Sequence, residues 1–267
     1  NQAVMAARLG ADVSMVTNRS SKIIFRRLSE DFLEQGVDTK NVFWSEESSG
    51  VAPIFVDDKG NNLIVIVPGA NWRLSPSDVR KASDAIKDAD VVVCQLEVPP
   101  ATTLEALRIA KEGKALTIFN PAPYCLLPEE IFLLSDVLAP NKIEAEAISG
   151  MAINGVKEAK KAIQKMFDLG TKAAIITLGE KGALVGDAKG IKKVPTIPVN
   201  CIDSTGAGDA FIGTLAYFLG LGTSLRKAAR IANVAAALSV TRLGTQLSFP
   251  SKEEIEKYIP LDESLED

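Results

Sequence analysis

The chain has 267 residues, of which 46% are hydrophobic and 24% are charged, and its formal net charge is −4. This composition is typical of a folded globular protein long enough to bury a sizeable core. The small negative charge gives no electrostatic reason to expect nucleic acid or an anionic membrane as a partner, and charges and glycines interrupt the apolar runs well before membrane length.

The absence of histidine restricts the chemistry that the chain can perform. It excludes Ser-His-Asp and Cys-His catalysis as well as zinc sites built on histidine. The three cysteines, Cys94, Cys125 and Cys201, are widely spaced and form no Cys-x-x-Cys pair. This usage favours a reducing compartment, and we expect a cytoplasmic protein.

The amino-terminal residues predict a helix followed by a strand. Apolar residues recur through 1–9, Gly10 is a helix stop signal, and the strand Asp12–Val16 follows. Because the sequence starts inside such a unit and without an initiator methionine, we expect that a further segment precedes Asn1.

A β-hairpin is predicted in the next part of the chain. Val51–Val56 and Leu63–Val67 are strand-like runs joined by a turn rich in aspartate, asparagine and glycine. Two antiparallel strands with no helix between them predict a small sheet that projects from the main body. We expect 46–67 to form this sheet, and 1–45 together with 68–267 to form an α/β body.

From Asp90 onward, apolar strands alternate with helices. Because these strands are apolar throughout, we expect a mostly parallel sheet that is covered by helices on both faces, in three α/β/α layers. The expected strands are Val91–Gln95, Ala115–Phe119, Val137–Ala139 and Ala173–Thr177, with a β-rich stretch over Ala183–Asn200. The expected helices are Ala101–Lys111, Leu127–Leu134, Ala145–Ser149, Val156–Leu169, Ala207–Leu219, Ser224–Thr241 and Lys252–Tyr258.

The segment Asp203-Ser-Thr-Gly-Ala-Gly-Asp-Ala-Phe211 carries the strongest chemical signal. Its small residues let backbone amides approach a ligand, and amides at a helix N-terminus attract anions, so we expect a phosphate group at Gly206, Ala207 and Gly208. Asp209 would lie in the first helical turn, where a carboxylate can take a proton from an attacking hydroxyl. A glycine-rich turn with an acidic helix cap is the structural alternative.

The whole segment resembles, nearly residue for residue, the signature of the ribokinase (pfkB-type) family of sugar kinases. No Gly-x4-Gly-Lys-Ser/Thr pattern occurs, so the P-loop route to phosphoryl transfer is excluded. Further family-like segments follow in the family's order: Gln95-Leu-Glu97, Asn120-Pro-Ala-Pro123, Pro140-Asn-Lys-Ile-Glu144, Thr177-Leu-Gly-x-x-Gly182 and Val240-Thr-Arg-x-Gly244. The resemblance implies a ribokinase-like fold with a small β lid and ATP-dependent phosphorylation of a sugar.

The resemblance also assigns residues to ATP and its magnesium ion. Asn141 and Glu144 would organise Mg²⁺ and the ATP phosphates, which is chemically sound because Mg²⁺ keeps most of its waters and needs few carboxylates. A helix cap with a solvated glutamate is the alternative. Asn233 would flank the adenine, with a surface amide as its alternative. The other residues implied at the ATP site are Thr177, Gly179, Gly182 and Gly208.

A potassium ion beside the phosphate-binding amides is a further implication of the resemblance. The implied residues are Asp203, Thr205, Ser239, Arg242, Gly244 and Ser248. Residue identity tests this site weakly, because most of its ligands would be backbone carbonyl oxygens.

The implied acceptor is D-ribose, phosphorylated with Asp209 as the base. Glu97 and Asn1 would contact the sugar hydroxyls, although Glu97 can also be read as a structural carboxylate. Asn1 matches only the last residue of the family's Gly-Gly-Lys-Gly-Ala-Asn sugar loop, and Thr17–Ser20 departs from the usual Gly-Asp-rich loop. Deoxyribose, another sugar or a nucleoside remain alternative acceptors, and an inactive nucleotide-binding fragment is the non-enzymatic alternative.

The resemblance finally implies how the protein assembles. Related proteins pair their β lids across a two-fold axis, which covers exposed strand edges. We therefore expect the full-length protein to be a homodimer through the lid hairpin, and the chain as given to be monomeric or prone to aggregate.

Overall fold

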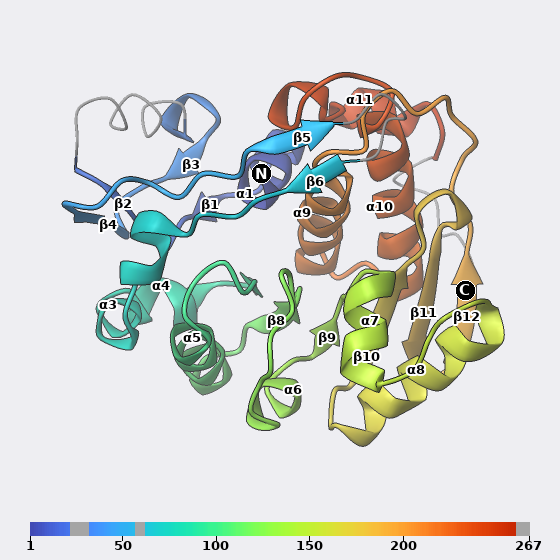
Figure 1. Ribbon diagram of the computed structural model, residues 1–267, viewed down its shortest axis with the longest axis horizontal. Coiled ribbons are helices and arrows are strands. Elements are labelled where there is room, and N and C mark those ends of the chain that lie inside the picture. Colours follow the sequence, from blue (N-terminus) through green and yellow to red (C-terminus); the bar gives the residue numbers. More distant parts are fainter. Residues whose placement is uncertain (22–31, 57–61, 260–267) are drawn as a thin grey trace.

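The computed structural model of the protein describes residues 1–21, 32–56 and 62–259 (Figure 1). The expected turn of the hairpin therefore lies almost entirely outside the described residues. A six-stranded sheet with the order β12-β11-β10-β9-β8-β7 forms the centre of the molecule. Its strands are β7 (Val91–Cys94), β8 (Leu116–Phe119), β9 (Val137–Leu138), β10 (Ala173–Thr177), β11 (Ala183–Asp187) and β12 (Gly190–Val194).

The sheet is parallel from β7 to β10 and antiparallel from β10 to β12. The parallel strands are linked by helices, whereas β11 and β12 are adjacent in the sequence and pair through a short turn. This confirms the expectation of a mostly parallel sheet, and it resolves the β-rich stretch into two antiparallel strands.

Two hydrophobic clusters lie on opposite faces of the sheet because successive residues of a strand point to opposite sides. In β10, Ile175 joins one cluster, while Ala174 and Ile176 join the other. The first cluster is covered by α1 (Gln2–Leu9), α9 (Ala207–Gly220) and α10 (Leu225–Ser239). The second is covered by α5 (Pro100–Glu112), α6 (Glu130–Leu133), α7 (Lys142–Ser149) and α8 (Val156–Asp168). The three-layer arrangement is confirmed.

Three small two-stranded sheets lie apart from the central sheet. They are the parallel pairs β1 (Val13–Ser14) with β3 (Val37–Asp38) and β2 (Thr17–Ser20) with β4 (Val42–Ser45), and the antiparallel pair β5 (Ile54–Val56) with β6 (Asn62–Ile64). In Figure 1 the β5–β6 pair is drawn above α9, and a bridge between Val51 and Val67 extends its pairing. The remaining elements are η1 (Gly69–Arg73), α3 (Pro76–Lys81), α4 (Ser83–Asp88), η2 (Gly179–Lys181), η3 (Gln246–Ser248) and α11 (Lys252–Glu256).

A glycine brings α1 into direct contact with α9. A Cβ atom at Gly213 would lie 2.5 Å from the Gln2 carbonyl oxygen and 2.8 Å from the Met5 Cβ, so no side chain fits there. Gly213 is one turn after Asp209 on the same helix, and this close approach therefore sets the first turn of α1 beside the first turn of α9.

Within the part of the chain that the structure describes, no helix is both long and apolar enough to cross a lipid bilayer.

Candidate active site

The predicted site residues gather at the carboxyl ends of the parallel strands. Glu97 follows β7, Asn120 follows β8, Asn141 follows β9, and Thr177 ends β10. These four strands are neighbours in the sheet, so their ends form one continuous edge. Open α/β sheets bind ligands at this edge.

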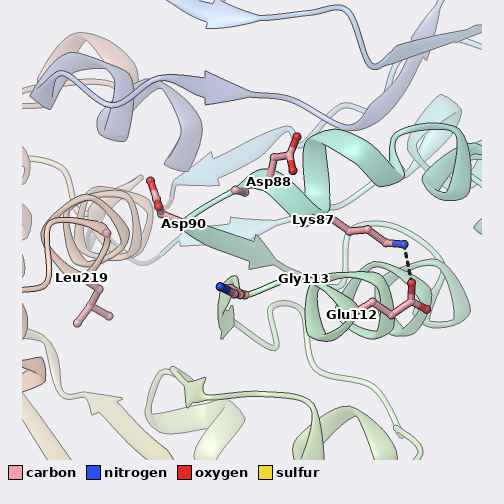
Figure 2. A pocket seen from close by; sticks show the side chains of 9 residues that line it. Lys87, Asp88, Asp90, Glu112, Gly113 and Leu219 are labelled. Atoms are coloured by element: carbon pink, nitrogen blue, oxygen red, sulfur yellow. Dashed lines mark ion pairs between the residues drawn. The ribbon is translucent and has the colours of Figure 1, made fainter.

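A pocket lies at the other end of the same strands (Figure 2). Asp90 immediately precedes β7 and Lys114 precedes β8, while Leu219 comes from the last turn of α9. An ion pair of 2.7 Å joins Lys87 to Glu112 at its rim. None of the predicted site residues lines this pocket, which separates it from the candidate active site.

The N-terminus of α9 has the geometry of an anion site. Gly206 caps the helix with φ 80°, a left-handed conformation that favours glycine, and a Cβ there would approach the Phe249 ring and the Thr245 Cα at 3.3 Å. A Cβ at Gly208 would meet nothing within 4 Å, so this turn faces open space. Within the described residues, the Gly206 and Gly208 amides have no hydrogen-bond acceptor. They are therefore available to a phosphate group.

Asp209 lies in this first turn, and both of its carboxylate oxygens accept hydrogen bonds from the start of the chain. Asn1 Nδ2 donates to Oδ2 at 2.8 Å, and Gln2 Nε2 donates to Oδ1 at 3.0 Å. The structure thus brings the predicted base and the predicted sugar ligand Asn1 into contact. Each oxygen keeps a lone pair with which it can accept the proton of a bound hydroxyl.

Glu97 lies close enough to Asp209 for their charges to interact. Its partial burial raises the pKa of its carboxyl group, and the negative charge of Asp209 raises it further. Two carboxylates on one side of an open anion site can hold a polyol by accepting hydrogen bonds from its hydroxyls, while only one of them needs to act as a base.

Asp203 joins the two loops that flank the N-terminus of α9. Its Oδ1 accepts from the Thr205 amide and its Oδ2 from the Gly244 amide, both at 2.9 Å. Hydrogen bonds from the Thr205 hydroxyl, the Thr205 amide and the Gly244 amide lower the pKa of Asp203. The predicted cation residues Asp203, Thr205 and Gly244 are therefore in direct contact.

The other three predicted cation residues have different partners: Ser239 ends α10, Arg242 follows it, and Ser248 ends η3. The buried Ser239 hydroxyl donates to the Ala236 carbonyl at 2.8 Å, and the buried Ser248 hydroxyl donates to the Thr245 carbonyl at 2.7 Å. Arg242 forms an ion pair with Glu254. Among the described residues, no group of three or more histidine, cysteine, aspartate or glutamate side chains is placed to hold a metal ion.

Asn141 and Glu144 form a capping box at the start of α7. The Asn141 amide and Nδ2 donate to the two Glu144 carboxylate oxygens at 2.8 and 2.9 Å, and the Glu144 amide donates back to Asn141 Oδ1 at 2.9 Å. Burial raises the pKa of Glu144 to about 7, against the opposing effect of the Asn141 amide. Glu144 is buried rather than solvated, so this cap also holds a carboxylate that a nearby cation would stabilise in its ionised form.

Thr177 and the two following glycines lie next to this cap. A parallel β-bridge joins Asn141 to Thr177, so the two predicted nucleotide residues are neighbours. Gly179 is exposed with φ 58° and has open space at its Cβ position. At Gly182, with φ 79°, a Cβ would lie 2.3 Å from the Val194 carbonyl oxygen. Gly182 therefore serves the turn, whereas Gly179 faces outward.

Asn233 is a buried amide, not the surface amide considered as its alternative. It is 5% exposed, and its Nδ2 donates to the carbonyls of Val194 and Pro195 at 3.1 and 3.2 Å. The Thr196 hydroxyl donates to the Asn233 carbonyl at 3.0 Å. Asn233 thus ties the segment after β12 to α10.

Gln2 is a residue of the site that sequence reasoning missed. It contacts Asp209 and Asn120 and accepts a hydrogen bond from Gln95. Gln95 and Asn120 stand in family-like segments, but no local pattern shows that a glutamine at the start of a helix meets an aspartate far along the chain.

Comparison with known proteins gives consistent results. The model of the pfkB family of carbohydrate kinases matches residues 1–252. A ribokinase of Mus musculus is 37% identical over 261 residues, covering 96% of this chain and 81% of the relative. A deoxyribokinase of Salmonella typhi is 37% identical over 265 residues, covering 98% and 87%. The structure of Arabidopsis thaliana ribokinase complexed with ribose and ATP superimposes with a TM-score of 0.87 at 26% identity, covering 96% and 84%.

Proposed function

Because the chain belongs to the pfkB family of carbohydrate kinases, we propose that it transfers the γ-phosphoryl group of ATP to the 5-hydroxyl of D-ribose. The products are ribose 5-phosphate and ADP. The observation that carries this proposal is Asp209 in the first turn of α9, between the sugar ligand Asn1 and the open amides of Gly206 and Gly208.

The reaction uses the chain's own groups as follows. Asp209 accepts the proton of the 5-hydroxyl as the oxygen–phosphorus bond forms and the bond to ADP breaks. The amides of Gly206 and Gly208 hold the charge on the transferred group, and the Ala207 amide joins them by exchanging its 3.3 Å hydrogen bond to the Ser204 carbonyl for one to the phosphoryl oxygen. Asn1 and Glu97 fix the sugar so that the hydroxyl meets the phosphorus in line.

The nucleotide lies across the carboxyl ends of β9 and β10 in this proposal. Thr177, Gly179 and Gly182 lie along the ATP phosphates. Asn233 supports the adenine side because it holds the segment at the end of β12. The open space at Gly179 supports this placement, because a phosphate can approach the main chain there.

Magnesium fits the Asn141–Glu144 pair. Glu144 is a buried carboxylate that has no cationic side chain as a partner among the described residues, which suits an added cation. When bound, Mg²⁺ supplies positive charge to the ATP phosphates. Asn141 and Glu144 hold the ion and keep it at the end of β9.

Potassium fits the joined loops beside α9. Such a cation prefers hard oxygen donors. This region offers the Asp203 carboxylate and the main-chain oxygens around Thr205, Ser239, Arg242, Gly244 and Ser248. When bound, the ion adds positive charge next to the anion site.

A second candidate for the acceptor sugar is 2-deoxyribose. The Salmonella typhi deoxyribokinase is as similar to this chain as the Mus musculus ribokinase is. A panel of ribose, 2-deoxyribose, fructose and adenosine, with ADP formation as the readout, separates them. We expect the highest kcat/KM with ribose; a higher value with any other acceptor would replace ribose in the proposal. The enzyme is made from the complete open reading frame that contains residues 1–267.

We also propose that the protein is a homodimer through its β lid and works in the cytoplasm. Exposed apolar side chains gather where the hairpin leaves the body, at Val51, Val65, Ile66 and Val67, and pairing of two lids would cover them. Light scattering is expected to give twice the subunit mass, and a monomer mass at high protein concentration would overturn the dimer.

The cysteines support the proposed cytoplasmic location. Cys94, Cys125 and Cys201 are all free thiols, which is typical of a reducing compartment.

A further inference from the structure

Gln2 lies at the centre of a network of side-chain amides beside Asp209. Its Nε2 donates to Asp209 Oδ1 at 3.0 Å and to Asn120 Oδ1 at 3.1 Å. Its Oε1 accepts from Gln95 Nε2 at 2.7 Å. Both hydrogens of the Gln2 amide group are therefore used, and its oxygen is occupied as well.

The network fixes which way each amide faces. An ionised carboxylate only accepts hydrogen bonds, so the nitrogen of Gln2, not its oxygen, must face Asp209. Gln95 donates to the opposite side of the Gln2 amide, where the oxygen then lies. Asn120 Nδ2 donates to the Ala139 carbonyl at 2.8 Å, which turns Asn120 Oδ1 toward Gln2. Each of these four hydrogen bonds joins a donor to an acceptor, and a flip of Gln2 would set its oxygen against the oxygens of Asp209 and Asn120.

The main chain of Gln2 is held as firmly as its side chain. Its carbonyl oxygen packs against Gly213, where a Cβ would lie only 2.5 Å away. Gly213 is one turn from Asp209 on α9, so the donor and the carboxylate are carried by two helices in direct contact. Little freedom is left in the distance between them.

We propose that Gln2 is a positioning residue for Asp209 and holds Oδ1, so that the carboxylate keeps the orientation in which it accepts the proton of the sugar hydroxyl. This inference rests on the proposed function. In this proposal Gln2 acts through Asp209, whereas Asn1 holds the other carboxylate oxygen and would also contact the sugar. Gln95 and Asn120, which stand in the family-like segments, hold Gln2 in place. They therefore contribute to catalysis indirectly, through Gln2 and Asp209.

The test is a change of Gln2 to methionine, which has similar length and no amide. We expect kcat to fall about 10- to 100-fold, as is usual when a reacting group loses its orientation, with KM for sugar and for ATP within about threefold. Gln164→Met makes the same change on an exposed site of α8 and is expected to leave kcat unchanged. Thermal unfolding of each variant shows whether the fold is kept, and Gln2→Leu serves as a second apolar replacement.

A double-mutant cycle separates positioning from a merely structural role. If Gln2 acts through Asp209, adding Gln2→Met to Asp209→Asn lowers the residual kcat by less than about threefold, because the group to be oriented is already gone. If Gln2→Met lowers kcat by as large a factor in the Asp209→Asn background as in the wild-type background, the inference is overturned. If wild-type enzyme phosphorylates another acceptor of the panel better than ribose, the proposed substrate fails, and the cycle is run with that acceptor. The two failures are thus distinguishable.

Discussion

Asp209→Asn is expected to lower kcat by about 10²- to 10⁴-fold, the usual contribution of a general base. Asparagine keeps the size of the side chain but cannot take up the proton of the attacking hydroxyl. Ribose and ATP should still bind, because the amides at the N-terminus of α9 and the Glu97 carboxylate are unchanged. Steady-state kinetics give kcat, and calorimetry gives both dissociation constants.

Asp88→Asn is the matched control for this variant. Asp88 is exposed at the far pocket, beyond the amino end of β7, so the same loss of charge there should leave kcat within twofold. If Asp209→Asn retains kcat within about threefold of wild type while Asp88→Asn is unaffected, Asp209 is not the base.

Glu97→Gln is expected to raise KM for ribose about 10- to 100-fold and leave KM for ATP within twofold. A hydrogen bond to a charged group contributes about 1.5–3 kcal/mol, and 1.4 kcal/mol corresponds to a factor of ten in affinity. Glutamine keeps one acceptor oxygen but has no charge. Glu158→Gln, in the first turn of α8 and outside the predicted site residues, is the matched control.

The pH dependence of ribose binding gives a second readout of Glu97. Burial and the charge of Asp209 raise its pKa above the usual value, so it becomes protonated at a higher pH than an exposed glutamate does. Protonation removes the charged acceptor, and KM for ribose should therefore rise as the pH falls through this raised pKa. The Glu97→Gln variant should lose that rise. An equal rise in wild type and variant would assign the effect to another group.

Local patterns predicted the elements that carry the chemistry. Helix α9 begins at Ala207, as the glycine-rich segment indicated, because Gly206 alone adopts the left-handed cap. Helix α7 begins at Lys142, earlier than the expected Ala145, because the side chains of Asn141 and Glu144 cap it. The helix cap, considered above as the alternative role of Asn141 and Glu144, is therefore present, and it starts the helix earlier than the apolar spacing indicated.

Elements that depend on tertiary contacts were missed or were predicted with the wrong length. The polar strand β2 reads as a loop, yet Asn18 and Ser20 are buried in a parallel pair with β4. The apolar run Leu127–Leu134 predicted a helix of that length, whereas α6 covers only Glu130–Leu133. Leu127 and Leu134 pack against the core from outside this short helix, whereas Leu133 inside it is exposed.

The contact between Gln2 and Asp209 shows the limit of the sequence most clearly. It depends on how closely α1 approaches α9, and Gly213 sets that distance from the middle of a helix where glycine carries no local meaning. Likewise, Asn233 is a polar residue that the sequence allowed on the surface, but helix packing buries it. Such positions follow from the assembled layers and not from any window of the chain.

The central claim is most directly tested by identifying the product formed from ribose. The enzyme made from the complete open reading frame is incubated with ATP, D-ribose, Mg²⁺ and K⁺, and the product is examined by phosphorus NMR with proton coupling. We predict one ADP for each sugar phosphate, with the phosphorus coupled to the two protons on carbon 5. A phosphoryl group on any other oxygen, or no ribose-dependent ADP at any ribose concentration, would contradict the account.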